Sequence, residues 1–337
     1  MTTPPFRPIL AALAGVCWLA AATPATAEVE HTTLTMPAIT IGFLAEYIAE
    51  DLHLWEKHEL DVKVAFIAGI GAMNAVISGS SDFSFSSGAS ITRAAAHGQK
   101  LLTIASLNNT SGEYVVLRKD LADAAHFDPN APLNVRAQIL KGRRFAIGGV
   151  NTISDAYLKV VAKEGGLRPD DVIVTPMQPP DMLSALSRNA IDGFSLGAPW
   201  AQLVTANGTG TIIANGNSGE PAKYTPFSSA ILVTRPQFCV DRHSVCVKMG
   251  RGIAEAVDFA YEHRDESIAL LRKRFTTLDV LVLAAAFDAV RTMLPRPPVT
   301  TVAGLVNADR MNEDAGFMKG EDELANYDAL FDNQYVK

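Results

Sequence analysis

Apolar and polar residues along this chain follow two different periods, and the two periods predict strands and helices in turn. Residues 60–67 are apolar at every second position, which is typical of a strand, whereas residues 43–55 carry apolar side chains at the spacing of a helix. Short strands continue to alternate with helices as far as residue 234. We therefore expect an α/β protein whose sheets are largely parallel and covered by helices on both sides.

One pattern occurs twice. Residues 74–96 and 184–204 each run from a helix through a small polar turn into a short strand that begins with an aspartate, and a second helix follows. We expect Asp82 and Asp192 to hydrogen-bond the preceding turn and fix the motif rather than contact a ligand. Because a helix start presents free backbone N–H groups, the repeat predicts two lobes with ligand-facing turns at one cleft.

The C-terminal third is different, because helical periodicity replaces the alternation. Apolar stripes run along residues 249–260 and 278–293, and Pro295 ends the second one. The simplest interpretation is that both stripes are packing faces of helices.

Length and charge narrow the class of protein. A chain of 337 residues favours two domains, and a formal net charge of −7 without a basic stripe argues against a nucleic-acid partner. Residues 1–27 have the layout of a signal peptide: a basic start, 14 apolar residues and a small-residue end at Ala27. The run is short for a membrane span, which needs about 20 residues. We expect cleavage after Ala27 and a periplasmic protein; lipid attachment through Cys17 is the less favoured alternative.

Two cysteines remain beyond the leader, Cys239 and Cys246. On one continuous helix they would lie about 10 Å apart, which is too far for a disulfide. An oxidising compartment favours pairing, so we expect a bend at residues 241–244. Two separate buried thiols are the alternative.

Candidate ligand contacts lie at or near predicted helix starts and strand ends. The serines there could instead be helix caps, and the tyrosine could belong to the core. Two facing helix starts favour an anion, whereas a carboxylate that reached the cleft would favour an amine or aminopyrimidine. The candidates are Phe43, Glu46, Tyr47, Ser86, Ser87, Ser90, Asn109, Asn151, Thr152, Ser154 and Trp200.

No reactive constellation is evident in the sequence. The histidines are scattered without metal-ligand spacing, and there is no Ser-centred nucleophile motif. We therefore expect no metal, no cofactor and no catalytic step.

Five segments in a fixed order resemble one family. They are "AEYIAEDLHLWEKHELDVKV", "AVISGSSDFSF", "LKGRRFAIGG", "AKEGGLRPDDVIV" and "ALSRNAIDGFSLGAPW". Together they resemble the NitT/TauT-type substrate-binding proteins of ABC transporters, the group for nitrate, sulfonates and thiamine-precursor pyrimidines. His53 and Glu59 depart from the family pattern, since glycine is usual at both positions, and we expect a strain of about 1 kcal/mol at such turns.

The resemblance implies a type II periplasmic-binding fold with two α/β lobes. The first lobe would comprise residues 28–112 and 235–337, and the second 113–234, with hinges near 112–116 and 228–233. It also implies a monomer that captures a small organic anion, such as a sulfonate or carboxylate, and delivers it to a permease with its ATPase. The alternatives are a binding protein for an aminopyrimidine thiamine precursor, a sensor that presents ligand to a membrane receptor, or a fold-related enzyme.

Overall fold

The computed structural model describes residues 1–2, 28–319, 322 and 324–337. The expected signal peptide, apart from its first two residues, lies outside the described residues. Within the described ranges, the helices are too short or too polar to span a bilayer.

Two five-stranded sheets with the same plan form the molecule. The first sheet has the order β2-β1-β3-β10-β4 and the second β7-β6-β8-β5-β9, so in each the fourth strand lies between two strands that follow one another in the chain, β3 and β4 or β8 and β9. That strand, β10 or β5, is antiparallel to both of its neighbours, whereas the other pairs are parallel. The expected two-lobed α/β architecture is present, but the sheets are mixed rather than wholly parallel.

The strands are short, and the bounds follow the alternation in the sequence. The first sheet is built from β1 (Glu30–Met36), β2 (Leu60–Phe66), β3 (Phe83–Ser86), β4 (Leu102–Ser106) and β10 (Ile231–Thr234). The second is built from β5 (Glu113–Arg118), β6 (Arg144–Ile147), β7 (Ile173–Pro176), β8 (Gly193–Gly197) and β9 (Gly210–Asn215).

Helices cover both sheets. Those that follow strands of the first sheet are α1 (Leu44–Asp51), α2 (Gly71–Ser78) and α3 (Gly88–Ala96). Those of the second are α4 (Lys119–Ala124), α5 (Leu133–Arg136), α6 (Ile153–Glu164), α7 (Pro179–Ser187) and α8 (Trp200–Ala206). The C-terminal part supplies α9 (Pro236–Asp241), α10 (His243–Glu262), α11 (Arg264–Arg274), α12 (Val280–Arg291) and α13 (Val302–Asp314).

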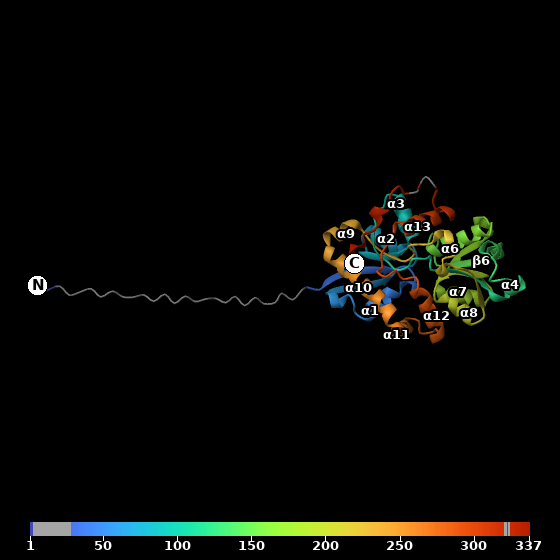
Figure 1. Cartoon of the computed structure of the whole chain (residues 1–337), viewed down its shortest axis with the longest axis horizontal. Coiled ribbons are helices and arrows are strands. Elements are labelled where there is room, and N and C mark those ends of the chain that lie inside the picture. Colours follow the sequence, from blue (N-terminus) through green and yellow to red (C-terminus); the bar gives the residue numbers. More distant parts are fainter. Residues whose placement is uncertain (3–27, 320–321, 323) are drawn as a thin grey trace.

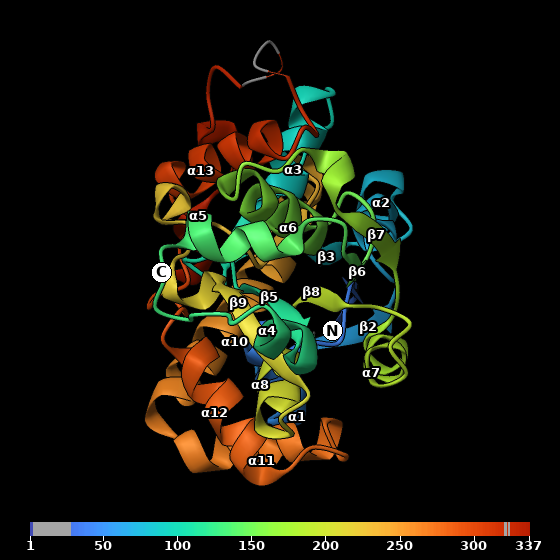
Figure 2. The same cartoon turned by 90° about the vertical axis from the view of Figure 1, so that its right-hand side faces the viewer.

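The lobes lie side by side, and the C-terminal helices span their junction (Figure 1). Helix α13 packs on α3 of the first lobe and on α6 of the second, while α12 contacts α8 on the opposite side. Ala308 and Met311 of α13 belong to the same apolar cluster as Tyr157 and Val160 of α6. In the perpendicular view α13 lies at one end and α11 and α12 at the other, with the strands between them (Figure 2).

The chain crosses between the sheets twice, and the two crossings are bonded to each other. Leu107 N–H donates to Ala230 O (2.7 Å), and Phe227 N–H donates to Asn109 O (2.9 Å). We call these segments, 107–112 and 227–230, the strap. The predicted second lobe extended to Thr234, but β10 pairs with β3 and β4, so residues 231–234 belong to the first sheet. The remaining lobe bounds stay a proposal.

The repeated aspartates tie neighbouring parallel strands together. Asp82 accepts hydrogen bonds from the hydroxyl of Thr32 (2.9 Å) and the backbone N–H of Thr33 (3.1 Å) on β1. Asp192 accepts from the backbone N–H and guanidinium of Arg144 on β6 (both 2.9 Å). Their role is structural, as expected, but the partner is the adjacent strand rather than the preceding turn.

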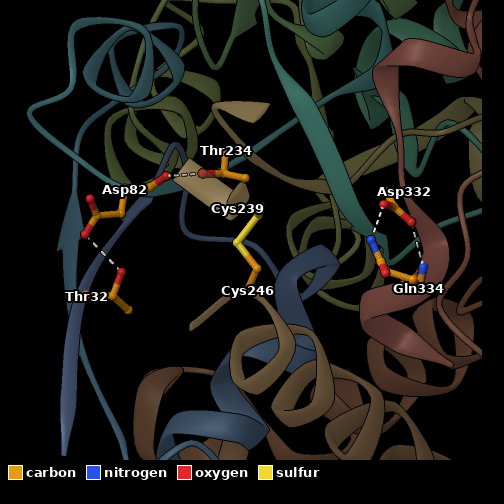
Figure 3. Close-up of a disulfide and its surroundings, with 7 residues drawn as sticks. All are labelled: Thr32, Asp82, Thr234, Cys239, Cys246, Asp332 and Gln334. Carbon is orange, nitrogen blue, oxygen red and sulfur yellow. Dashed lines mark hydrogen bonds between the residues drawn. A yellow bond between two sulfur atoms is a disulfide. The ribbon is translucent and has the colours of Figure 1, made fainter. Parts of the chain in front are cut away.

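The two cysteines are bonded in the structure. Cys239 lies in α9 and Cys246 in α10, and the chain bends between the helices at Arg242, where φ is −126° and ψ is 51°. The bend brings the Cα atoms to 5.6 Å. Figure 3 shows the bridge beside β10, where Thr234 donates to Asp82 O. The disulfide therefore clips α9 to α10 just after the chain has returned to the first sheet.

The two departures from the family pattern fold as left-handed turns. His53 has φ 54° and Glu59 φ 57°, a region that glycine occupies without steric cost. The two left-handed turns therefore form with His53 and Glu59 in place of glycine, as expected.

Candidate functional site

A cavity of about 110 Å³ lies at the seam between the lobes. The first lobe contributes the turn before α1 and the start of α3, and the second contributes the start of α6 and the end of β8. The strap forms the wall where the lobes join. The cavity is therefore a single space lined by both lobes.

Six of the predicted contact residues line this cavity. Each comes from a helix start or from the turn before one, where the strands of an α/β sheet deliver polar side chains. They are Phe43, Ser86, Ser87, Ser90, Thr152 and Ser154.

The hydroxyls of the first lobe at this cavity are already partly bonded within the chain. Ser87 is the N-cap of α3, and its oxygen accepts from Ser90 N–H (3.2 Å) while its hydroxyl donates to Ser90 Oγ (3.0 Å). Ser86 Oγ contacts the sulfur of Met73 at 3.4 Å. The alternative role of the serines as helix caps thus holds for Ser87, which lines the cavity as well.

Helix α6 starts at the cavity without such a cap. Thr152 occupies the N-cap position, but its hydroxyl donates to Gly149 O (2.7 Å) and makes no cap hydrogen bond. Ser154 accepts from Gly148 N–H (3.0 Å). Neither side chain therefore makes a cap hydrogen bond to this helix. The first turn of this 12-residue helix faces the cavity without a bond from its N-cap side chain, while Asp155 of the same turn accepts from Asn151 N–H (2.9 Å).

Five predicted residues lie outside the cavity lining. Asn109 and Asn151 are exposed, and the carbonyl of Asn151 accepts from Arg93 of α3 (2.8 Å) across the lobes. Trp200 donates from its indole N–H to Ile39 O (3.2 Å), another contact between lobes. These residues join the lobes or face solvent rather than line the cavity.

Glu46 and Tyr47 face away from the cavity, into the packing of α1 on the C-terminal helices. Tyr47 packs edge-on against Phe275, and Arg274 lies over its ring. Glu46 is 1% exposed, and neither carboxyl oxygen has a hydrogen-bond partner among the described residues. Burial, reinforced by the nearby Glu50 and opposed by Arg274, raises the pKa of Glu46 to about 8.

Sequence reasoning missed Glu113, the single ionisable side chain among the described residues that line the cavity. It begins β5 opposite Gly197 of β8, is 8% exposed, and its Oε2 has no partner among the described residues. Burial raises the pKa of Glu113 to about 8. The sequence feature that could have indicated Glu113 is an acidic residue directly before the apolar run 114–117.

Asn108, Ser111 and Ser229 of the strap region also line the cavity and were missed. Asn108 donates from Nδ2 to Ser229 Oγ (3.2 Å), which leaves its Oδ1 buried without a partner among the described residues. Ser111 Oγ is likewise unpartnered there. Loop polarity alone did not distinguish these residues from ordinary turn residues.

The cavity has a simple electrostatic character. No lysine, arginine or histidine lies among the described residues that line it, and Glu113 is its one acid. In the described part of the chain, no group of three or more His, Cys, Asp or Glu is placed to hold a metal ion. The site can hold a small molecule by hydrogen bonds, a helix dipole and one carboxyl group.

Known proteins share this architecture. A family model described as NMT1/THI5 like matches residues 40–267. A binding protein of Brucella abortus is 24% identical over 244 residues, which is 70% of each chain.

Solved structures agree on the fold. The alkanesulfonate-binding protein SsuA from Xanthomonas axonopodis pv. citri, bound to MOPS, has a TM-score of 0.67 at 17% identity over 86% of this chain and 93% of its own. The nitrate-binding protein NrtA from Synechocystis has a TM-score of 0.61 at 18% identity over 76% and 69%. The expected periplasmic-binding-protein fold is thereby confirmed.

Proposed function

The chain belongs to the NMT1/THI5-like family, and from this membership and the cleft geometry we propose that it is the solute-binding protein of an ABC importer. It captures a small organic anion between its lobes and delivers it, unchanged, to a permease with its ATPase. The observation that carries the proposal is the cavity at the lobe seam, whose walls come from both lobes.

Capture follows from where the contacts lie. A ligand in the cavity contacts both lobes only when they are closed, so binding shifts the open–closed equilibrium toward the closed form. The closed form also makes its own contacts: Ala198 O accepts from the Thr40 hydroxyl (2.6 Å) and from Ile41 N–H (2.9 Å).

Hydrogen bonds of this number are sufficient for tight binding. Micromolar affinity corresponds to about 8 kcal/mol. A charge-assisted hydrogen bond contributes about 1.5–3 kcal/mol net, and a helix start about 0.3–1 kcal/mol. Four or five contacts to the hydroxyls, the α6 start and the strap therefore account for the affinity, and no chemical step is needed.

The preference for an anion rests on α6. Its uncapped start offers backbone N–H groups and the positive dipole end to the cavity, and Thr152 and Ser154 stand beside it. SsuA and NrtA, whose folds are similar, are an alkanesulfonate-binding and a nitrate-binding protein. We propose a sulfonate or carboxylate as the class to test first.

Export and monomeric state belong to the same proposal. We propose that residues 1–27 direct the chain to the periplasm and are removed after Ala27. Intact-mass measurement of the protein from the periplasmic fraction tests both the location and the cleavage position, and light scattering tests the monomer.

Thermal unfolding with a ligand panel tests the function. The panel contains sulfonates, carboxylic acids, nitrate and aminopyrimidines, and a true ligand stabilises by RT ln(1 + [L]/Kd), about 2.7 kcal/mol at a hundredfold excess over Kd. Mass spectrometry of the recovered ligand then shows whether the protein releases the compound unchanged, as a carrier does, or converts it, as an enzyme does. A chemically altered compound, or no stabilisation by any class, would refute the carrier function.

A further inference from the structure

Three residues that line the cavity carry a polar atom without a partner among the described residues. These atoms are Glu113 Oε2, Asn108 Oδ1 and Ser111 Oγ, and all three are buried. Buried polar groups are almost always hydrogen-bonded, so such atoms in the lining of a cavity mark a place for a ligand. Two of the three atoms, the carboxylate and amide oxygens, are acceptors. The missing partner must therefore bring hydrogen-bond donors.

Several donors of the cavity lining are already used within the chain. The hydroxyls of Thr40, Ser87 and Thr152 already donate to Ala198 O, Ser90 Oγ and Gly149 O. One of the two N–H groups of the Asn108 side chain donates to Ser229 Oγ. No cationic side chain among the described lining residues can approach Glu113.

We propose that Glu113 determines ligand specificity and that the ligand carries a protonated amino group, which donates to this carboxylate. The inference rests on the proposed solute-binding function and refines its ligand class from an organic anion to an amino-substituted one. The acidic group of the ligand lies at the α6 start, and its ammonium group lies against the strap.

The carboxylate needs a cation to be charged in this position. An ionised carboxylate that is buried without a partner is strongly unfavourable, and an opposite charge within about 4–6 Å restores the charged form. The titratable groups that face Glu113 are the phenols of Tyr114, on β5, and Tyr157, on α6, and burial raises the pKa of both. Neither phenol is a cation, so the ligand supplies the charge.

Glycine keeps the space beside the carboxylate open. A Cβ added to Gly197 would lie 3.1 Å from Thr40 Oγ1 and 3.8 Å from Glu113 Oε1. The absence of that carbon leaves room for a ligand group between the two side chains. The geometry thus provides both the acceptor and the access to it.

Ethylammonium chloride is the probe, because it carries the amino group and nothing that α6 would bind. Titration calorimetry and thermal unfolding compare the wild type with Glu113→Gln at pH 7.0 and 8.5, with sodium ethanesulfonate in parallel and sodium chloride at equal ionic strength as the blank. Glu46→Gln is the matched control, since Glu46 is also buried and unpartnered but lies outside the cavity. Circular dichroism confirms folding, and Glu113→Asp tests rescue by a shorter carboxylate.

We expect low-millimolar binding of ethylammonium to the wild type and to Glu46→Gln, and at least a tenfold loss in Glu113→Gln with partial recovery in Glu113→Asp. Because the carboxyl must ionise, affinity should rise about tenfold from pH 7.0 to 8.5. Absence of ethylammonium binding to the wild type, or equal binding to Glu113→Gln, overturns the inference.

The inference is also overturned if ethanesulfonate binding requires Glu113 and weakens at high pH. In that case Glu113 would be protonated and would donate a hydrogen bond to an anion. The ligand panel judges the solute-binding function separately. A panel ligand without an N–H group that binds Glu113→Gln as well as wild type refutes the amine and leaves the carrier function in place.

Discussion

Replacing Glu46 by glutamine should stabilise the protein, and the gain should grow with pH. Glu46 is 1% exposed in α1, and both carboxyl oxygens lack partners among the described residues. Burial, with Glu50 adding and Arg274 opposing, raises the pKa of Glu46 from its ordinary value of 4.5 to about 8. Glutamine has nearly the same shape as the protonated acid but never ionises.

The size of the effect follows from proton linkage. The folded state keeps the proton on Glu46 until about pH 8, whereas the unfolded chain loses it near 4.5, so the folded state binds more protons between these values. Stability is therefore fully present below pH 4.5, falls as pH rises toward 8, and is flat above. At about 1.4 kcal/mol per pH unit, the shift corresponds to about 5 kcal/mol at pH 8.5 and about 3 kcal/mol at pH 7.

Urea unfolding at pH 5.0, 7.0 and 8.5, followed by tryptophan fluorescence and circular dichroism, measures this difference. The gain of Glu46→Gln over wild type should be under about 1 kcal/mol at pH 5.0 and rise at each step. Glu313→Gln, at an exposed position of α13, is the control and should change stability little at any pH. A gain that does not depend on pH would refute the assignment of a protonated Glu46.

Three further outcomes follow from the contacts. Serine at both Cys239 and Cys246 should lower the free energy of unfolding by about 2.5 kcal/mol, the entropy of opening an eight-residue loop, as measured by urea unfolding. Burial would raise the pKa of Asp314, but the Lys163 ammonium and other donors lower it to about 2, so its stabilisation is present above pH 3.8 and lost as pH falls toward 2. Asp314→Asn should therefore destabilise at pH 7 by about 1–3 kcal/mol and match wild type near pH 2, and thermal unfolding across that range would contradict this if the loss persisted. Trp200→Phe removes a hydrogen bond that joins the two lobes, and should weaken ligand binding about two- to tenfold in calorimetry, whereas unchanged affinity would mean that this contact does not support closure.

The sequence was informative wherever a feature depended on residues close together along the chain. The recurrence of an aspartate-led strand at residues 82 and 192 predicted two lobes, and both lobes have the same strand order. The serines before α3 and the polar residues before α6 line the cavity because a helix start and its preceding turn are set locally. The bend between the cysteines was also predictable, because the alternative geometry of one helix could not be bridged.

Features set by distant residues were not predictable. Which face of α1 points to the cavity depends on α10 and α11, some 200 residues away, and these helices turn Glu46 and Tyr47 inward. Trp200 is likewise held by Phe275 and Ile39. In the sequence Glu113 is simply the polar first residue of a strand, and only its pairing with Gly197 and its place in the cavity lining reveal a buried acid.

Helices α11 and α13 also escaped prediction. The segment 264–274 is rich in charge and has almost no apolar stripe, and residues 302–314 contain buried asparagine and aspartate. Asn312 donates to Ala89 O and Thr92 Oγ1 of α3. Residues far away in the chain therefore satisfy the buried polar groups of α13, whose presence had made the segment look unlike a packed helix.

The strap limits how the lobes can move. Because Leu107 bonds Ala230 and Phe227 bonds Asn109, the two connections form one paired ribbon rather than two independent tethers. A paired ribbon resists sliding of one body along the other but permits them to swing apart about a line through it. The arrangements of the two lobes in solution then differ mainly in one opening angle. An extra residue inserted in 109–112 would shift the register of the paired segments and so change the resting angle between the lobes.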